Sequence, residues 1–426
     1  METEEYATLL LAPLYGEPTT PSTVDIKRAV AEGRRRRRSR QVLGYAAIAA
    51  LTALALAGLP AADRLLANAG PAPKGGPAGS PTTSSSPAAS GSPTAAGSPA
   101  IVQPPEPTAP ATATPRPPTR CTLARLPIPS GRTMGLVTGA DPTGRYLLGR
   151  AYPAPYQVLI WDNGRQVKVD VPGGDQVLYD INSSGTAVGV SYTDSIVPWA
   201  YRNGKVSPLP GVSSGEARGI NEAGVIVGSR SSAGGIPVRW ASPSSPPTDL
   251  PLPSDGDWRG LAYSVDEDGT VVGTLSPAGS SDSADRGYVW PPDGAVRELP
   301  VPVIDGTRAT TVRAFTIRYG WVTGLAGRGA TTVAVRWNVH TGEVRTFPQF
   351  SVRASTANRY GWQVGPASNG QAVFLSDAGA VMLPDLAGHR QPLDNIATSV
   401  SDDGRTIGGQ ANDRDDVIQA VVWRCT

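Results

Sequence analysis

Carboxylates are the residues of this chain best suited to acid–base chemistry, and several stand in glycine-rich, turn-like segments. Hydrolases that cleave glycosidic bonds use two carboxylates, set about 5 Å or roughly 6.5–9.5 Å apart. The candidates here are Asp180, Glu216, Asp266, Glu267 and Asp268. The sequence leaves open whether any two of them converge, so it favours a binding protein over an enzyme.

Other chemical sites have weaker support. The two histidines, His340 and His389, stand in loops and lack the spacing of a metal pair. Residues 401–406 are similar to the Asp box of sialidase propellers, but the spacing is one residue short and that box is a structural turn. Residues 412–416 carry oxygen ligands that suit Ca²⁺, without the spacing of a known loop. We therefore expect no catalytic residue, cofactor or metal.

These residues lie within a short pattern that returns seven times after residue 120. Each copy begins with an aliphatic or small residue, and the next residue is usually Asn, Asp or Ser. Two variable residues, a Gly, a β-branched or apolar pair and a second Gly follow. The second glycines are Gly149, Gly189, Gly228, Gly273, Gly324, Gly365 and Gly408. Their spacing of 39 to 51 residues is typical of four-stranded propeller blades. Solenoids of paired helices have similar periods, but Val, Ile, Thr, Trp and Tyr between Gly and Pro favour strands.

Each copy is predicted to form two hairpins. The Asn-x-x-Gly step suits a type I turn whose Gly takes the left-handed conformation. An aromatic strand follows, marked by Trp161, Tyr201, Trp240, Trp290, Trp337, Phe374 and Trp423. Since these aromatic residues recur in every copy, we assign them to the core rather than to a sugar-binding surface. The fifth copy has Ile317 where Asn is expected, and the sixth lacks the Trp.

The seventh copy stops before its fourth strand, and a matching segment stands at the other end of the domain. Residues 121–129 end in the Leu-Pro pattern of the outer strands, where a missing backbone donor costs little. We expect this segment to complete the last blade, since an open ring would leave two sheet edges unpaired. The only cysteines, Cys121 and Cys425, stand at this seam. They are predicted to form a disulfide; the alternative is two unrelated buried thiols.

The N-terminal part has the pattern of a membrane anchor. Eight Lys and Arg residues within 27–40 directly precede an uncharged stretch at 42–62. Twenty-one residues of helix span roughly 30 Å, about one bilayer core. The positive-inside rule then places residues 1–41 in the cytoplasm. A cleaved signal peptide ending near residues 67–69 is the alternative. The basic run by itself also resembles a nucleic-acid patch or a twin-arginine signal.

Residues 63–120 are expected to form a disordered extracellular stalk. From residue 70 onward they contain no aromatic residue and few charges, so they bury too little apolar surface to offset ordering entropy. The cytoplasmic segment 1–41 is too short for a core of its own. The net charge of +2 gives no indication of nucleic-acid binding.

The repeat resembles the extracellular HAF-repeat family. The resemblance is carried by residues 181–189 with 198–201, and by residues 220–228 with 238–240. Where the family has His-Ala-Phe before its Trp, this chain has Val-Arg-Trp, Tyr-Val-Trp or Val-Val-Trp. The family consists mainly of secreted or surface repeats, so the resemblance implies fold and location and adds little about chemistry. The anchor and stalk are similar in composition to those of actinobacterial membrane proteins.

Together these patterns predict a single-pass, N-inside membrane protein that displays a seven-bladed, all-β propeller over residues 121–426. The predicted function is recognition or scaffolding of a cell-wall glycan, peptide or protein, with no nucleic-acid partner. The alternatives are an extracytoplasmic hydrolase or lyase with carboxylates in the channel, and a receptor whose short tail meets a cytoplasmic regulator. The insertions at 276–286 and 303–313 are further places to look for a site, because loops carry function more often than scaffolds do.

Overall fold

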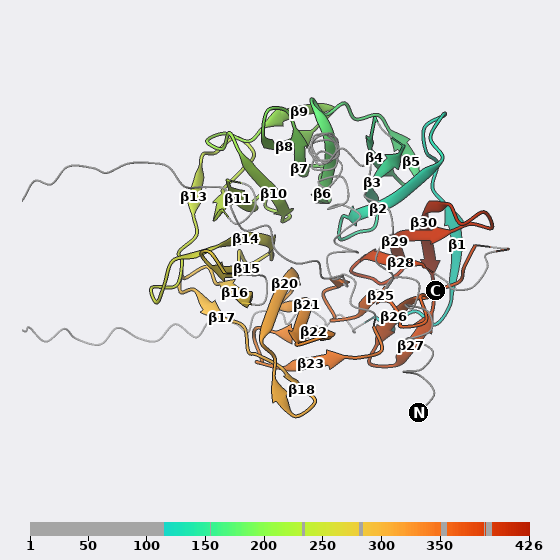
Figure 1. The fold of residues 1–426 in the computed structure, drawn as a ribbon. Helices are drawn as coiled ribbons and strands as arrows, with labels where there is room; N and C mark the ends of the chain where they lie inside the picture. Colours follow the sequence, from blue (N-terminus) through green and yellow to red (C-terminus); the bar gives the residue numbers. More distant parts are fainter. Residues whose placement is uncertain are drawn as a thin grey trace, which may run out of the picture. The chain divides into compact units, whose positions relative to one another are not determined.

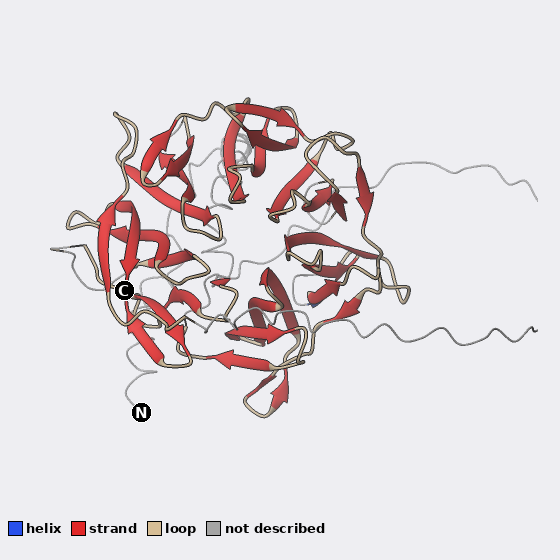
Figure 2. Cartoon of the chain, turned by 180° about the vertical axis from the view of Figure 1, so that it is seen from behind, coloured by secondary structure: helices blue, strands red, loops and turns tan. Residues whose placement is uncertain are grey.

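The computed structural model describes residues 115–153, 155–231, 235–280, 284–350, 356–386, 388 and 394–426. Within these residues the chain forms seven four-stranded antiparallel sheets arranged as the blades of a ring, and one two-stranded sheet (Figures 1 and 2). The predicted all-β, seven-bladed propeller is confirmed. The predicted tail, the helix at 42–62 and residues 63–114 of the stalk lie outside the described residues. No helix within the described ranges has the length and apolar character needed to cross a membrane.

The first three blades follow the order of the chain, from the inner strand outward. Blade 1 contains β2 (Met134–Ala140), β3 (Tyr146–Tyr152), β4 (Gln157–Asp162) and β5 (Arg165–Val167). Blade 2 contains β6 (Gly174–Ile181), β7 (Ala187–Tyr192), β8 (Ile196–Arg202) and β9 (Lys205–Pro208). Blade 3 contains β10 (Gly215–Ile220), β11 (Ile226–Arg230), β12 (Ile236–Trp240) and β13 (Pro247–Asp249).

The remaining blades repeat this plan, except that the last takes its outer strand from the other end of the domain. Blade 4 contains β14 (Trp258–Val265), β15 (Val271–Pro277), β16 (Arg286–Trp290) and β17 (Arg297–Glu298). Blade 5 contains β20 (Thr311–Arg318), β21 (Trp321–Arg328), β22 (Thr331–Asn338) and β23 (Val344–Phe347). Blade 6 contains β24 (Thr356–Ala357), β25 (Gln363–Pro366), β26 (Ala372–Ser376) and β27 (Gly379–Met382). Blade 7 contains β28 (Ile396–Val400), β29 (Thr406–Asn412), β30 (Ile418–Cys425) and β1 (Cys121–Arg125).

The ring closes where β1 pairs antiparallel with β30. Cys121 lies opposite Cys425 in this register, and the two form a disulfide across 304 residues of sequence. The backbone N–H of Thr119 also donates to the carbonyl of Thr426 at 2.9 Å, so the paired segment begins before residue 121. The predicted strand exchange and disulfide are confirmed.

The recurring aromatic side chains are buried in the blades. All seven, from Trp161 to Trp423, are at most 9% exposed. In five blades the indole N–H donates to the carbonyl of the proline that lies two residues beyond the outer strand of the preceding blade. These bonds join Trp161 to Pro127, Trp240 to Pro210, Trp290 to Pro251, Trp337 to Pro300 and Trp423 to Pro384, at 2.7–3.0 Å. The recurring Leu-Pro motif and the recurring Trp are therefore the two partners of one contact between neighbouring blades.

The first glycine of each repeat adopts positive φ. The residues are Gly144, Gly185, Gly224, Gly269, Gly320, Gly361 and Gly404. The second glycine has a different role, which is clear at Gly228: a Cβ there would lie 1.8 Å from the carbonyl oxygen of Glu216. A register shift between Ala217 and Gly219 accompanies this close approach. The same bulge occurs on the inner strands of blades 1, 2, 4, 5 and 7.

The asparagine of the repeat joins neighbouring blades. Asn182 Oδ1 accepts the N–H of Thr186 within its own turn, and its Nδ2 donates to the carbonyl of Asn221 in the next blade at 3.1 Å. Asn221 Nδ2 donates in turn to the carbonyl of Asp266. These bonds fix the positions of the turns at one end of the ring axis.

Two repeat assignments made from the sequence were wrong by one residue because turn lengths differ. In blade 5 the turn is one residue shorter than in blade 2, with Ile317 opposite Val322 and Arg318 opposite Trp321. Ile317 therefore occupies the place of Ile181, and Arg318 stands where Asn was expected. In blade 7 the turn is one residue longer, so Gly409 rather than Gly408 lies opposite the bulge.

The insertion predicted at 303–313 forms a small hairpin before blade 5. Its strands are β18 (Val303–Ile304) and β19 (Thr307–Arg308), and Figure 1 shows it projecting from the outer side of the ring. Ile304 is buried against the blade whereas Val303 is 58% exposed. The hairpin therefore lies on the periphery, away from the ring axis. The other insertion, at 276–286, is only partly within the described residues.

Candidate functional site

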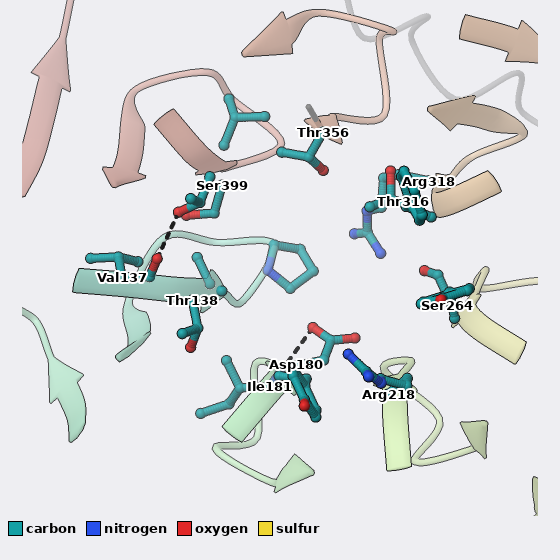
Figure 3. Close-up of a pocket in the computed structure, with 18 of the residues that line it drawn as sticks. Val137, Thr138, Asp180, Ile181, Arg218, Ser264, Thr316, Arg318, Thr356 and Ser399 are labelled. Atoms are coloured by element: carbon teal, nitrogen blue, oxygen red, sulfur yellow. Dashed lines mark hydrogen bonds between the residues drawn. The ribbon is translucent and has the colours of Figure 1, made fainter. Parts of the chain in front are cut away.

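The innermost strands of all seven blades surround a cavity of about 280 Å³ on the ring axis (Figure 3). The bulges bring the same strand position of six blades to its wall. The residues at that position are Thr138, Tyr179, Arg218, Tyr263, Phe315 and Thr398. A bulge re-aims the side chain at its extra residue, so the repeated backbone presents a different group from each blade.

The next position along the strands is mostly small and polar. It holds Gly139, Asp180, Ser264, Thr316, Thr356 and Ser399, all of which line the cavity. At this strand position the cavity wall is therefore rich in hydroxyl groups, and Asp180 is the single carboxylate among the residues there.

Arg218 is held among aromatic and acidic neighbours. Its guanidinium lies 4.0 Å from the ring centroid of Tyr179 and 5.7 Å from that of Tyr263. It also forms an ion pair with Glu216. Burial raises the pKa of Tyr179 to about 12 and also raises the pKa of Tyr263, so both phenols keep their protons at neutral pH.

Arg318 links three blades at the end of the cavity where the repeat turns lie. Its Nε and Nη2 atoms donate to the two carboxylate oxygens of Asp402 in blade 7, at 3.1 and 2.6 Å. Its Nη1 donates to Glu267 at the turn of blade 4. A bidentate pair of this kind fixes the guanidinium plane. Arg318 occupies this position because the turn of blade 5 is the shortest of the seven described turns.

Asp180 is directed into the cavity from β6 (Figure 3). Its Oδ1 accepts the N–H of Ile181 and its Oδ2 accepts the N–H of Ile220, both at 2.9 Å. Burial raises the pKa of Asp180 to about 7, although these two hydrogen bonds and the charge of Arg318 oppose the shift. The carboxyl group therefore exchanges its proton near neutral pH.

The raised pKa predicts how stability depends on pH. The folded chain binds the Asp180 proton more tightly than the unfolded chain, whose pKa is about 3.9. This group therefore stabilises the fold at low pH, and its contribution is lost as the pH rises through about 7. Relative to the wild type, Asp180→Asn should gain about 2–3 kcal/mol in free energy of unfolding between pH 5 and pH 8. Urea unfolding at both pH values measures this difference.

The exposed Asp415 offers a matched control. Asp415→Asn should change stability equally at the two pH values. The same result for Asp180→Asn would contradict the assignment of the raised pKa.

The structure uses most of the acidic residues singled out in the sequence for scaffolding. Asp266 accepts the N–H groups of Tyr319 and Gly320 from the next blade, and Asp268 accepts that of Thr270 within its own turn. Glu216 and Glu267 form ion pairs with the two arginines of the cavity. Among the five candidates, Asp180 alone lines the cavity, although it too bonds a neighbouring blade through the N–H of Ile220.

The other sequence candidates lie elsewhere. His340 is exposed in a turn, and His389 lies outside the described residues. Asp403 caps its own turn by accepting from Ser401 and Arg405. In residues 412–416, Asp413 accepts the N–H groups of Asp415 and Val417. No group of three metal-ligating side chains occurs in the part of the chain that the structure describes.

Comparison with known proteins adds no family. No protein-family model matches this chain, and no curated protein does. Among solved structures, TolB from Acinetobacter baumannii is 15% identical with a TM-score of 0.38, over 70% of this chain and 65% of that one. Raptor from Chaetomium thermophilum is 10% identical with a TM-score of 0.40, over 70% of this chain and 29% of that one. This chain thus spans less than two thirds of either protein, and the HAF-repeat resemblance stays a prediction.

Sequence reasoning missed Arg218, Arg318 and Asp402 as cavity residues. One signal was present at Arg218, which stands where the other described copies carry Thr, Tyr or Phe. Bulge positions and turn lengths were needed to convert that signal into a location.

Proposed function

We propose that this protein is a recognition module whose ring binds a polar ligand in its central cavity. The proposal rests on a difference between two groups of residues in the ring. Side chains that recur from blade to blade hold the ring together, whereas the cavity wall carries side chains that differ between blades. A cavity of about 280 Å³ is at the small end for ligand sites, so it suits one sugar or amino-acid unit of a larger ligand.

We further propose that the ring lies outside the cell, on a stalk joined to one membrane-spanning helix at 42–62. The basic run before that segment supports an N-inside orientation. The disulfide between Cys121 and Cys425 supports an oxidising compartment. The resemblance to the extracellular HAF-repeat family agrees with this location. Cell-wall glycans, peptides and wall proteins are then the available partners.

An array of wall glycans and peptides, probed with the full chain in detergent, tests the recognition function. We expect retention of at least one wall fragment, lost when Thr356→Phe fills the cavity from β24. Thr248→Phe on the outer strand β13 is the control and should leave retention unchanged. Equal retention by both variants would place the ligand elsewhere, and no retention of any wall fragment would contradict the proposal.

Catalysis is a second candidate because one observation favours it. A carboxyl group with a pKa of about 7 suits general acid–base chemistry at neutral pH. The other carboxylate that lines the cavity, Asp402, is bound to Arg318, so the free pair of a glycosidase is not what the cavity presents. If the protein is a hydrolase or lyase, mass spectrometry should detect cleavage of a retained wall fragment, abolished by Asp180→Asn.

A further inference from the structure

We propose that the ligand of the central cavity presents a primary ammonium group to Asp180. This inference rests on the recognition function proposed above and specifies the chemistry of its ligand. It is argued from the charges of the cavity, the hydrogen-bonding capacity of the carboxylate, and the polar groups around it.

The charges around the cavity favour a cation. Its two guanidinium groups face four carboxylates. Arg218 is paired with Glu216, and Arg318 is paired with both Glu267 and Asp402. Among the described residues, no cation forms an ion pair with Asp180. A ligand carboxylate or phosphate would have to compete with existing ion pairs, whereas a ligand ammonium would meet an available acid.

The carboxylate of Asp180 has capacity left for a donor. Each of its oxygens accepts a single backbone N–H, from Ile181 or Ile220. A carboxylate has about four acceptor directions, so about two stay open toward the cavity. Both bonds come from backbone groups, which fix the orientation of the carboxylate without neutralising it.

The neighbouring wall suits the remaining donors of an ammonium group, which has three N–H bonds. Ser264, Thr316 and Thr356 line the same cavity. The hydroxyl of Ser264 accepts the N–H of Ile317 and that of Thr316 is bonded to the hydroxyl of Thr323, which leaves each oxygen acceptor capacity for one more donor. Ser399 also lines it, but its hydroxyl is buried against Gly408 of the adjacent strand. An amine attached to a polar body, such as an amino sugar or a peptide N-terminus, satisfies these groups together.

The charged groups that face Asp180 set how binding depends on pH. Arg318 favours the ionised carboxylate, and Glu222 of the neighbouring turn disfavours it. Arg218 lies close by on β10 (Figure 3), with its charge offset by Glu216. An ammonium ligand needs Asp180 ionised, so its affinity should fall by about tenfold between pH 7.5 and pH 5.5. A neutral ligand has no such requirement.

Calorimetry with the full chain in detergent tests the inference through two matched pairs of probes. One pair is a glucosamine trisaccharide and its fully N-acetylated form; the other is triglycine amide and its N-acetylated form. In at least one pair the free amine should bind at least tenfold more tightly than its acetylated partner at pH 7.5, and should lose about tenfold at pH 5.5. The pair that responds identifies the sugar or the peptide as the source of the amine.

Two variants locate the effect. Asp180→Asn should reduce amine binding at least tenfold and remove its pH dependence, whereas Asp415→Asn should change neither. If Asp180→Asn does not fold, the comparison of amine with acetylated probe on the wild type still decides. Equal binding of both members of each pair would overturn the inference and leave the recognition function standing. Failure of both amines to bind would also overturn it, and the wall-fragment array would then judge recognition separately.

Discussion

Removing the disulfide by Cys121→Ser with Cys425→Ser is expected to lower the free energy of unfolding by about 5 kcal/mol. The bond joins residues 304 positions apart. In the chain-entropy model, a cross-link that closes so long a loop restricts the unfolded chain strongly and lies near the top of the usual range. No other covalent bond joins the outer strand β1 directly to its neighbour β30 in blade 7, because the two strands come from opposite ends of the domain.

Urea unfolding of the double variant and the wild type, both without reductant, measures this effect. The wild type in reductant should match the double variant, and reductant should not change the double variant further. Hydrogen exchange should accelerate first at residues 121–127, which lose their covalent tie to blade 7. A double variant as stable as the wild type would show that the backbone pairing of β1 with β30 closes the ring unaided.

The second large effect is expected at a tryptophan that joins two blades. Trp240→Ala should cost about 3–5 kcal/mol, since the indole is fully buried and its removal leaves a cavity. It also leaves the carbonyl of Pro210 without the donor that now lies at 3.0 Å. Trp240→Phe separates the two contributions: it keeps most of the apolar contact, and the unpaired carbonyl should cost about 1–3 kcal/mol.

Trp258 offers a matched control. It is only partly buried, at the start of an inner strand, and its indole donates to Asp255 rather than to the carbonyl of a neighbouring blade. Trp258→Ala should therefore cost about 1 kcal/mol. Denaturant unfolding of the three variants measures these differences. Equal losses for Trp240→Ala and Trp258→Ala would mean that the bond between blades contributes little.

The repeat made the architecture predictable because one unit, once recognised, is copied seven times. The period gave the number of blades, the truncated last copy gave the closure, and the positions of Cys121 and Cys425 gave the disulfide. Each of these inferences depends on spacing along the chain. Spacing survives small local errors, such as those made at Ile317 and Gly408.

The cavity could not be predicted in the same way, because it depends on which side of an inner strand each residue faces. A single bulge or a change of one residue in a turn reverses that assignment. Asp180 was among five candidate acids, and nothing in its spacing set it apart from Asp266. Arg318 was not a candidate, because counting back from Gly324 assigned its place to Ile317.

The shortened turn at Tyr319 and Gly320 has a consequence for any molecule on the axis. Seven identical sectors would offer such a molecule seven equivalent poses, a degeneracy of about 1 kcal/mol in statistical terms. Because Arg318 takes the place of an amide in one sector only and reaches Asp402 in another, rotation about the axis no longer maps the wall onto itself. The cavity thus lacks the rotational symmetry of the blades that surround it, so a bound molecule has one preferred orientation.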